Sequence, residues 1–311
     1  MPRGRARVAA PPVLVEVLRG DVVESRHRGS LALVDPAGEL VASLGDAEQV
    51  IFLRSCAKPF QLAPFVASGL FDRYGFGDEA LAIMAASHSG EDRHVRTVQA
   101  LLRQAGLTQS VLQCGTHAPY DVETARRLAR DGEPPTPIRH NCSGKHAGMV
   151  LFAKALGEPI ETYWRPDHPI QRQILQSVSA ATGLPAAKIR VGTDGCGAPT
   201  FAVPLSAAAR AFARLADPST MDDGRLADAL RRIRDAMMAH PELVGGERRR
   251  LDTALMRAEP RRFVAKGGAE GMEAVALLPG AVEAAAGGPL GLALKIEDGD
   301  PAGRARNAAT C

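Results

Sequence analysis

The chain has 311 residues, of which 45% are hydrophobic, so it can bury a substantial core as one large domain or as two lobes. Its 38 basic and 35 acidic residues give a formal net charge of +3, and this balance predicts no nucleic-acid partner. No apolar run of signal length opens the chain, and no stretch approaches the roughly eighteen apolar residues of a membrane span. These features predict a folded cytoplasmic protein with no membrane partner.

The first part of the chain has the alternating pattern of β-strands. Apolar and polar residues alternate over 13–19, and further strands are expected at 30–35 and 40–46, with a turn at 35–39 between them. Strand patterns return near the other end of the chain, over 262–280 and 291–300.

From about residue 56 the apolar residues recur at spacings of three and four, which predicts helices, with Gly69 and Gly106 as C-caps. The helical segments are 57–70, 77–89, 91–107, 146–157, 168–184 and 222–243. We therefore predict an α/β fold of the α+β type. A mainly antiparallel sheet from both chain ends, about 12–50 and 260–300, packs against a helix-rich region of about 56–255.

Lysine is scarce in this chain: six lysines stand against 32 arginines. A lysine amine can lose its proton when it is desolvated and then act as a base, nucleophile or metal ligand, whereas a guanidinium cannot. Lys154 and Lys188 have the context of surface charges on helices. The other four lie in short motifs rich in small or polar residues, and they are Lys58, Lys145, Lys266 and Lys295.

The motif "RSCAKP" places Ser55 three residues before Lys58. On a first helical turn the two share a face, so a neutral Lys58 could accept the hydroxyl proton of Ser55, as in S-x-x-K acyl-enzymes. The alternative is a serine at a helix start beside a solvated lysine. Pro59 fits a helix whose first turn begins there.

Two further stretches offer partners for such a pair. "AASHSGEDRH" contains Ser87, a second hydroxyl for a distant lysine, although Ser89 or Gly90 could simply open the next helix. Lys266 precedes two glycines and loosely resembles the K-T-G strand of penicillin-recognising enzymes, where small residues let a substrate approach the backbone.

The five cysteines are odd in number and widely spaced, which predicts no disulfide framework; they are Cys56, Cys114, Cys142, Cys196 and Cys311. In "HNCSGKHAGM", Cys142 stands three residues before Lys145, and Cys196 lies in the glycine-rich "VGTDGCGAPTF". A neutral Lys145 could complete a Cys, Lys, Cys metal site with water as the fourth ligand. Two structural cysteines in glycine-rich loops are the alternative.

Five motifs occur along the chain in this order: "FLRSCAKPFQ", "SHSGED", "HNCSGKHAGM", "GTDGCGAPTF" and "KIEDGD". They resemble, in the same order, the signatures of the rhizobial-type L-asparaginases, also called class 3 or the asparaginase II family. The resemblance covers nearly the whole chain. The resemblance implies a serine β-lactamase/glutaminase-like fold in a single domain over 1–311. It also implies a homodimer that hydrolyses L-asparagine to L-aspartate and ammonia.

Carried over by motif, the resemblance pairs Ser55 with Lys58 and Ser87 with Lys266 as two catalytic Ser-Lys tandems. It places zinc, as a cofactor that the reaction need not require, among Cys142, Lys145 and Cys196. The candidate substrate-binding residues are Arg54, His88, Asn141 and Asp194, the last of them beside the metal position.

The expected mechanism is acyl transfer, in which Ser55 attacks the side-chain amide and water hydrolyses the β-aspartyl ester. Three alternatives remain open: a β-lactamase or peptidase-like acyl-enzyme, a zinc-water hydrolase without a covalent intermediate, and a non-catalytic metal-stabilised binding protein. The chain ends at "PAGRARNAATC", where the family resemblance leads us to expect a further helix.

Overall fold

The computed structural model describes residues 10–311; residues 1–9, which the predicted single domain includes, lie outside the described residues. The strands are β1 (Val13–Arg19), β2 (Val22–Val34), β3 (Leu40–Leu44), β4 (Val50–Phe52), β5 (Arg190–Thr193), β6 (Pro199–Pro204), β7 (Phe263–Gly267), β8 (Met272–Leu277) and β9 (Leu290–Ile296). The α-helices are α1 (Lys58–Ala67), α2 (Asp78–Met84), α3 (Asp92–Gln104), α4 (Val122–Arg130), α5 (Ser143–Leu156), α6 (Pro169–Thr182), α7 (Leu205–Ala216), α8 (Gly224–Ala239), α9 (Pro241–Val244), α10 (Leu251–Ala258) and α11 (Arg306–Thr310). A short 3-10 helix, η1 (Arg54–Ala57), leads directly into α1.

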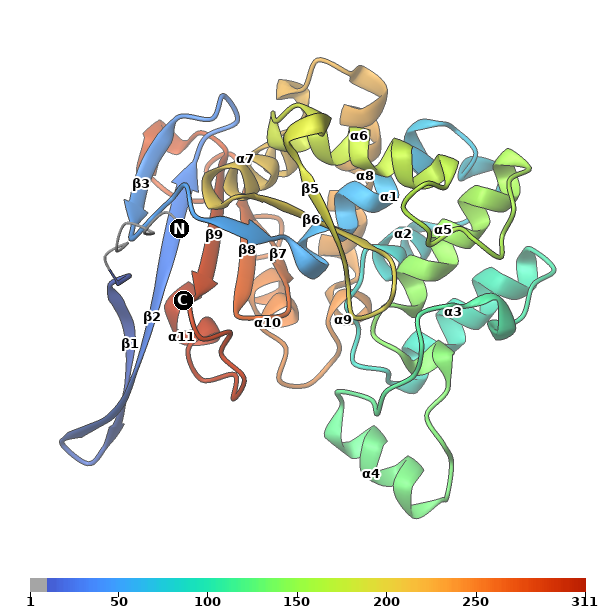
Figure 1. The fold of residues 1–311 in the computed structure, drawn as a ribbon, viewed down its shortest axis with the longest axis horizontal. Helices are drawn as coiled ribbons and strands as arrows, with labels where there is room; N and C mark the ends of the chain where they lie inside the picture. Colours follow the sequence, from blue (N-terminus) through green and yellow to red (C-terminus); the bar gives the residue numbers. More distant parts are fainter. Residues whose placement is uncertain (1–9) are drawn as a thin grey trace, which may run out of the picture.

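The larger sheet joins the two ends of the chain. Its strand order is β1-β2-β9-β8-β7, with β3 also paired to β2, and every pairing is antiparallel. In Figure 1 the blue strands of the N-terminal part lie beside the red strands of the C-terminal part, and Ala32 of β2 stands opposite Ala293 of β9. The predicted antiparallel sheet from both chain ends is confirmed.

One face of this sheet is covered by the alanine-rich helix α7, which packs on β2, β8 and β9. Small side chains allow the helix to approach the sheet closely. At Gly291 of β9 a Cβ atom would lie only 1.9 Å from the carbonyl oxygen of Ala209, so this position requires glycine.

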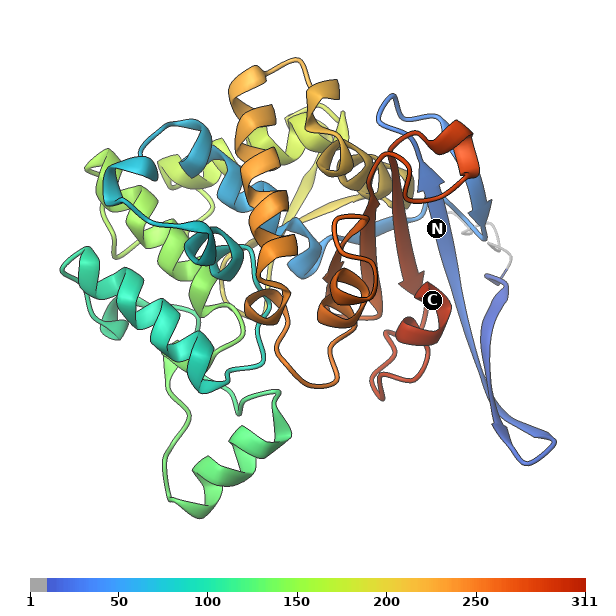
Figure 2. The same ribbon diagram turned by 180° about the vertical axis from the view of Figure 1, so that it is seen from behind.

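Most of the remaining helices form a lobe around α1, which packs against α5, α6 and α8, while α2 packs against α3, α5 and α8. In contrast, α10 packs on β7 and α11 packs on β9. Figure 2 shows the orange helix α8 between this lobe and the red strands of the sheet. The predicted C-cap glycines, Gly69 and Gly106, have φ values of +72° and +69° and directly follow the C-cap residues of α1 and α3.

The sequence analysis missed a second sheet, of order β4-β6-β5. Strands β5 and β6 lie within the region predicted to be helix-rich, and β4 lies just before it. The strands of this sheet are short, and the glycine-rich stretch 191–201, taken for a loop, forms most of β5, the hairpin turn at 194–198 and the start of β6. Within residues 10–311, none of the helices has both the length and the apolar composition needed to cross a bilayer.

Candidate active site

The motif "RSCAKP" forms a sharp turn where η1 meets α1. Arg54 has a φ of +49°, a left-handed value that is uncommon outside glycine. Lys58 is the first residue of α1, with Pro59 in the first turn, as predicted. The backbone N–H of Lys58 donates to the carbonyl oxygen of Ser55. This turn buries both side chains at the junction of the helical lobe and the large sheet, because η1 also contacts β7 and β8.

Lys58 is the buried centre of the site, with 1% of the residue exposed. Its Nζ donates to Ser87 Oγ at 2.8 Å and to the carbonyl oxygens of Ala86 at 2.5 Å and Asn141 at 3.3 Å. Burial lowers the pKa of Lys58, because desolvation disfavours the ammonium form, while the neighbouring Cys142 opposes this shift. A lysine of lowered pKa bonded to a hydroxyl is the arrangement that general-base activation of a serine requires.

The hydrogen bonds differ from the predicted pairing of Ser55 with Lys58 and Ser87 with Lys266. Lys58 bonds to Ser87, Lys266 Nζ donates to the carbonyl oxygen of Gly267 at 2.8 Å, and Ser55 Oγ has no hydrogen-bond partner among residues 10–311. The physical reason is that the Lys58 side chain reaches across to the segment after α2 and to Asn141 before α5, where three oxygens compensate for the loss of water around its amine.

Ser87 and His88 follow α2 on one segment but face different surroundings. Ser87 lines the cavity described below. His88 is fully buried; its Nδ1 accepts from the backbone of Gly90 at 3.2 Å, and its Nε2 lies 2.9 Å from Ser143 Oγ. The structure therefore does not bring His88 to the cavity as a substrate contact. Neither Ser89 nor Gly90 opens the next helix, since Glu91 is the N-cap of α3.

Lys266 lies fully buried on β7 among charged groups. Burial lowers the pKa of Lys266 to about 8, although the charge of Asp252 acts in the opposite direction. Nearby, burial and the charge of Asp252 raise the pKa of Glu273 to about 8. Lys266 can therefore change protonation state near neutral to mildly alkaline pH.

The predicted metal residues do come together. Cys142 is the N-cap of α5, and Asp194 and Cys196 lie in the β5–β6 turn; one ligand atom of each lies within 4.8 Å of the others. Lys145 Nζ is 3.0 Å from Cys196 Sγ. Gly144 makes this packing possible, because a Cβ there would lie 2.0 Å from the carbonyl oxygen of Ile83 in α2.

The electrostatics of this cluster favour a thiolate beside an ammonium. The hydrogen bond from Cys142, together with the charge of Lys145, lowers the pKa of Cys196 despite its burial. Burial acts to lower the pKa of Lys145, but the charges of Cys196, Cys142 and Asp194 together raise it. Two thiol sulfurs, a carboxylate and an amine are a donor set that suits zinc, provided that the amine gives up its proton.

Two of the predicted substrate-binding residues pair with each other. Arg54 Nε donates to Asp194 Oδ1 at 2.7 Å. This ion pair links the turn before α1 to the cluster of predicted metal ligands. Neither residue lines the cavity, whereas Asn141 does.

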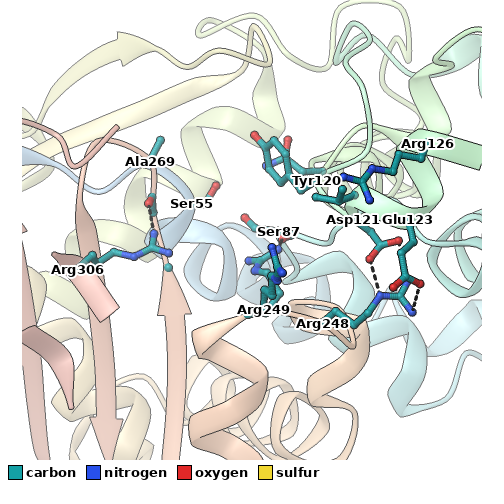
Figure 3. Close-up of a pocket in the computed structure, with 15 residues that line it drawn as sticks. Ser55, Ser87, Tyr120, Asp121, Glu123, Arg126, Arg248, Arg249, Ala269 and Arg306 are labelled. Carbon is teal, nitrogen blue, oxygen red and sulfur yellow. Dashed lines mark hydrogen bonds and ion pairs between the residues drawn. The ribbon is translucent and has the colours of Figure 1, made fainter. Parts of the chain in front are cut away.

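Ser55 and Ser87 share the wall of a cavity of about 470 Å³. Figure 3 shows both serines between Arg306 on one side and Tyr120 and Arg248 on the other. The lining residues combine the two serines with glycines and several charged side chains: Ser55, Ser87, Tyr120, Asp121, Val122, Glu123, Arg126, Asn141, Arg248, Arg249, Arg250, Gly267, Gly268, Ala269 and Arg306.

Several charged residues at this site were missed by the sequence analysis. Arg248 bonds to Asp121 at 2.7 and 2.9 Å, Arg250 pairs with Asp252, and Arg306 of α11 donates to the carbonyl oxygen of Gly268 at 2.9 Å. The run of three arginines at 248–250, followed closely by an aspartate on an otherwise apolar helix face, was a usable signal. Arg306 offered none, because it lies in a short helix near the end of the chain.

The chain matches the family model for L-asparaginase II over residues 15–311. No curated protein gives a match. Among solved structures, a probable glutaminase from Bacillus subtilis complexed with 6-diazo-5-oxo-L-norleucine is 12% identical, with a TM-score of 0.41 and coverage of 91% of this chain and 80% of that chain. A β-lactamase from Desulfarculus baarsii is 15% identical, with a TM-score of 0.41 and coverage of 91% and 89%. A β-lactamase from Mycobacterium bovis is 14% identical, with a TM-score of 0.39 and coverage of 86% of each chain.

At TM-scores this low the structural likenesses carry no weight in the assignment, which rests on the family match. That match spans nearly all of the chain, from within β1 of the large sheet to the last residue of the chain. The protein is an amidohydrolase that belongs to the L-asparaginase II family.

Proposed function

We propose that this protein hydrolyses L-asparagine to L-aspartate and ammonia through a seryl ester. The observation that carries the proposal is the hydrogen bond of 2.8 Å between the buried amine of Lys58 and Ser87 Oγ, on the wall of a cavity that Ser55 also lines. A desolvated lysine and two serines at one cavity provide a nucleophile and a base.

In this mechanism Ser55 is the nucleophile. Its hydroxyl lines the cavity and has no hydrogen-bond partner among the described residues, which leaves its oxygen available to attack the side-chain amide carbon of the substrate. The pair of Lys58 and Ser87 accepts the hydroxyl proton as the new C–O bond forms. Backbone N–H groups near Ser55 are expected to stabilise the oxyanion.

The tetrahedral intermediate collapses when the C–N bond breaks and the pair of Lys58 and Ser87 returns the proton to the leaving ammonia. Water then attacks the ester, its proton passes to the same pair, and Ser55 leaves as a hydroxyl with free aspartate. Lys266 is proposed to assist these proton transfers, since burial brings its pKa to about 8. All atoms balance with water as the only co-substrate.

We also propose zinc as a cofactor, held by Cys142, Lys145 and Cys196, with Asp194 close enough to join them. A zinc ion there would supply a positive charge able to bind the amino or carboxylate group of the substrate. Lys145 would have to lose its proton to bind the metal, and Asp194 would keep Arg54 oriented through their ion pair. The metal is not needed to generate the nucleophile in this mechanism, because Lys58 and Ser87 accept the proton of Ser55.

An ammonia-release assay with L-asparagine and L-glutamine, each with and without a chelator, tests the proposal. We expect turnover of L-asparagine by the wild type and a loss of several orders of magnitude in Ser55→Ala, with the far-ultraviolet circular dichroism unchanged. Loss of activity on chelation with full activity in Ser55→Ala would instead select the zinc-water mechanism. Turnover of a chromogenic β-lactam and not of L-asparagine would select the β-lactamase alternative. The binding-protein alternative predicts no turnover at all and unfolding when the metal is removed.

A further inference from the structure

A buried ion pair joins the segments that carry Ser87 and Lys266. Arg250 immediately precedes α10, and Asp252 lies in the first turn of that helix. Arg250 Nη2 donates to Asp252 Oδ2 at 2.8 Å, and the two side chains are 15% and 1% exposed. We call this pair the Arg250–Asp252 bridge.

The arginine end of the bridge holds the backbone of Ser87. Arg250 Nη1 donates to the carbonyl oxygen of Ser87 at 2.7 Å and to that of Gly245 at 2.9 Å. It also lies 3.2 Å from Ser89 Oγ. The guanidinium is planar and its N–H donors point in fixed, divergent directions. Nη1 can therefore contact these backbone oxygens while Nη2 contacts Asp252.

The aspartate end of the bridge holds the strand of Lys266. Asp252 Oδ1 accepts a hydrogen bond from the backbone N–H of Gly267, the residue that follows Lys266 on β7. A Cβ at Gly267 would lie 3.3 Å from the same oxygen, so the carboxylate sits directly against this glycine. A continuous chain of hydrogen bonds thus runs from the Ser87 carbonyl through Arg250 and Asp252 to the N–H of Gly267.

We propose that Arg250 and Asp252 are positioning residues that fix the segments of Ser87 and Lys266 relative to each other beside the cavity. This inference rests on the proposed function, because it assumes that both of those residues serve the reaction. The bridge would act on catalysis through geometry, without contact between Asp252 and the substrate.

A purely stabilising role is the competing explanation, and the physics gives it little support. A buried ion pair loses much of its attraction to the cost of desolvating both charges, so well-packed apolar residues stabilise a fold as well or better. One end of this bridge binds the backbone carbonyl of Ser87, and the other binds the backbone N–H of Gly267, next to Lys266. A bridge that only stabilised the fold would leave kcat unchanged in any variant that is still folded.

The bridge also belongs to the electrostatic surroundings of Lys266. The charged or titratable groups around that amine, from all the elements packed near it, are Asp252, Arg250, Glu273, Arg306, Lys58 and Cys56. Of these, Asp252 supplies the strongest attraction for the ammonium form. Loss of the Asp252 charge should therefore lower the pKa of Lys266 further. In a profile of kcat against pH, the limb that follows the titration of Lys266 should move toward lower pH.

The test uses Asp252→Asn, which removes the charge, and Arg250→Lys, which keeps a cation beside Asp252 but loses the fork. Asp228→Asn is the control, because it removes an exposed pairing with Arg231 at 3.1 Å on α8. We expect kcat for L-asparagine to fall about 100-fold in both bridge variants, as is typical when reacting groups shift by about 1 Å, with little change in KM. The Asp252→Asn profile should also move toward lower pH, and Asp228→Asn should match the wild type.

Chemical rescue separates positioning from folding. Arg250→Ala should regain activity when guanidinium is added at concentrations well below denaturation, and it should regain none with urea, which has the same shape and no charge. Folded bridge variants with wild-type kcat and an unchanged pH profile would overturn the inference.

If the wild type does not hydrolyse L-asparagine, the proposed function fails, and amide hydrogen exchange then decides the fate of the bridge. Loss of protection around both residues 86–89 and 265–268 in Asp252→Asn and Arg250→Lys, with none in Asp228→Asn, would support it. Unchanged protection in the two bridge variants would overturn it.

Discussion

Gly144→Ala should damage the protein although it adds only one methyl group. Gly144 lies in the first turn of α5, between the proposed metal ligands Cys142 and Lys145, and faces α2. The new Cβ would lie 2.0 Å from the carbonyl oxygen of Ile83 and 2.8 Å from its carbon, both of them backbone atoms that cannot rotate away. An ordinary contact needs at least 3.4 Å, so α2 and α5 would have to separate by roughly 1.4 Å.

Overpacking of this kind costs about 1–3 kcal/mol in free energy of unfolding. The cost should exceed the gain of up to about 1 kcal/mol from replacing glycine by alanine within a helix. The separation would also displace Cys142 and Lys145 from Cys196, so we expect weaker zinc binding as well as lower stability.

The matched control is Gly148→Ala, one turn later on the same helix and facing the same partner. There the Cβ would meet Met84 Cγ and Sδ at 3.2 Å, and this flexible side chain can move. Urea unfolding and elemental analysis of both variants make the comparison. Equal stability and equal zinc content in the two variants would refute the argument that backbone contact at Gly144 constrains the site.

Three further predictions test the chemistry of the buried charges. Lys58→Arg and Lys266→Arg keep the charge but cannot release a proton, so each should lower kcat by about 10²–10⁴-fold, nearly as much as alanine; retained turnover would mean that these lysines serve only as cations. Burial raises the pKa of Glu273 to about 8 from 4.5, so the folded protein holds an extra proton between these values, and the stability contribution of this carboxyl falls as pH rises through that interval. Glu273→Gln should remove this pH-dependent loss in urea unfolding, and identical pH dependence in wild type and variant would contradict it. Lys145→Arg should strip zinc as completely as Cys142→Ser does, and zinc should be lost from the wild type on acidification; elemental analysis that finds equal zinc in wild type and Lys145→Arg would exclude the amine as a ligand.

The large sheet and most helices were predictable because local patterns encode them. Alternation over 13–19 and apolar spacing of three and four over 91–107 predicted β1 and α3, which run over Val13–Arg19 and Asp92–Gln104. The second sheet was missed because β5 and β6 have only four and six residues, too few for alternation to stand out beside glycines.

The sequence predicted which residues belong to the site better than it predicted which of them are hydrogen-bonded to each other. The scarcity of lysine directed attention to Lys58 and Lys266, and both are buried. Lys58 bonds to Ser87, and the carbonyl oxygen of Lys266 accepts from Cys56, the residue after Ser55. Sequence spacing paired Lys58 with Ser55, but the amine bonds to Ser87, 29 residues away, because burial of a long side chain is decided by tertiary packing. The contacts of Arg250 and Asp252 with Ser87 and Gly267 depend on the same long-range packing.

The most direct test of the account is intact-mass and peptide mass spectrometry of the enzyme quenched with acid during turnover of L-asparagine. We predict a mass increase of one β-aspartyl group on the peptide that contains Ser55, absent from Ser55→Ala, which should show no measurable turnover. Turnover without any covalent adduct in the wild type, together with retained activity in Ser55→Ala, would contradict the seryl-ester mechanism.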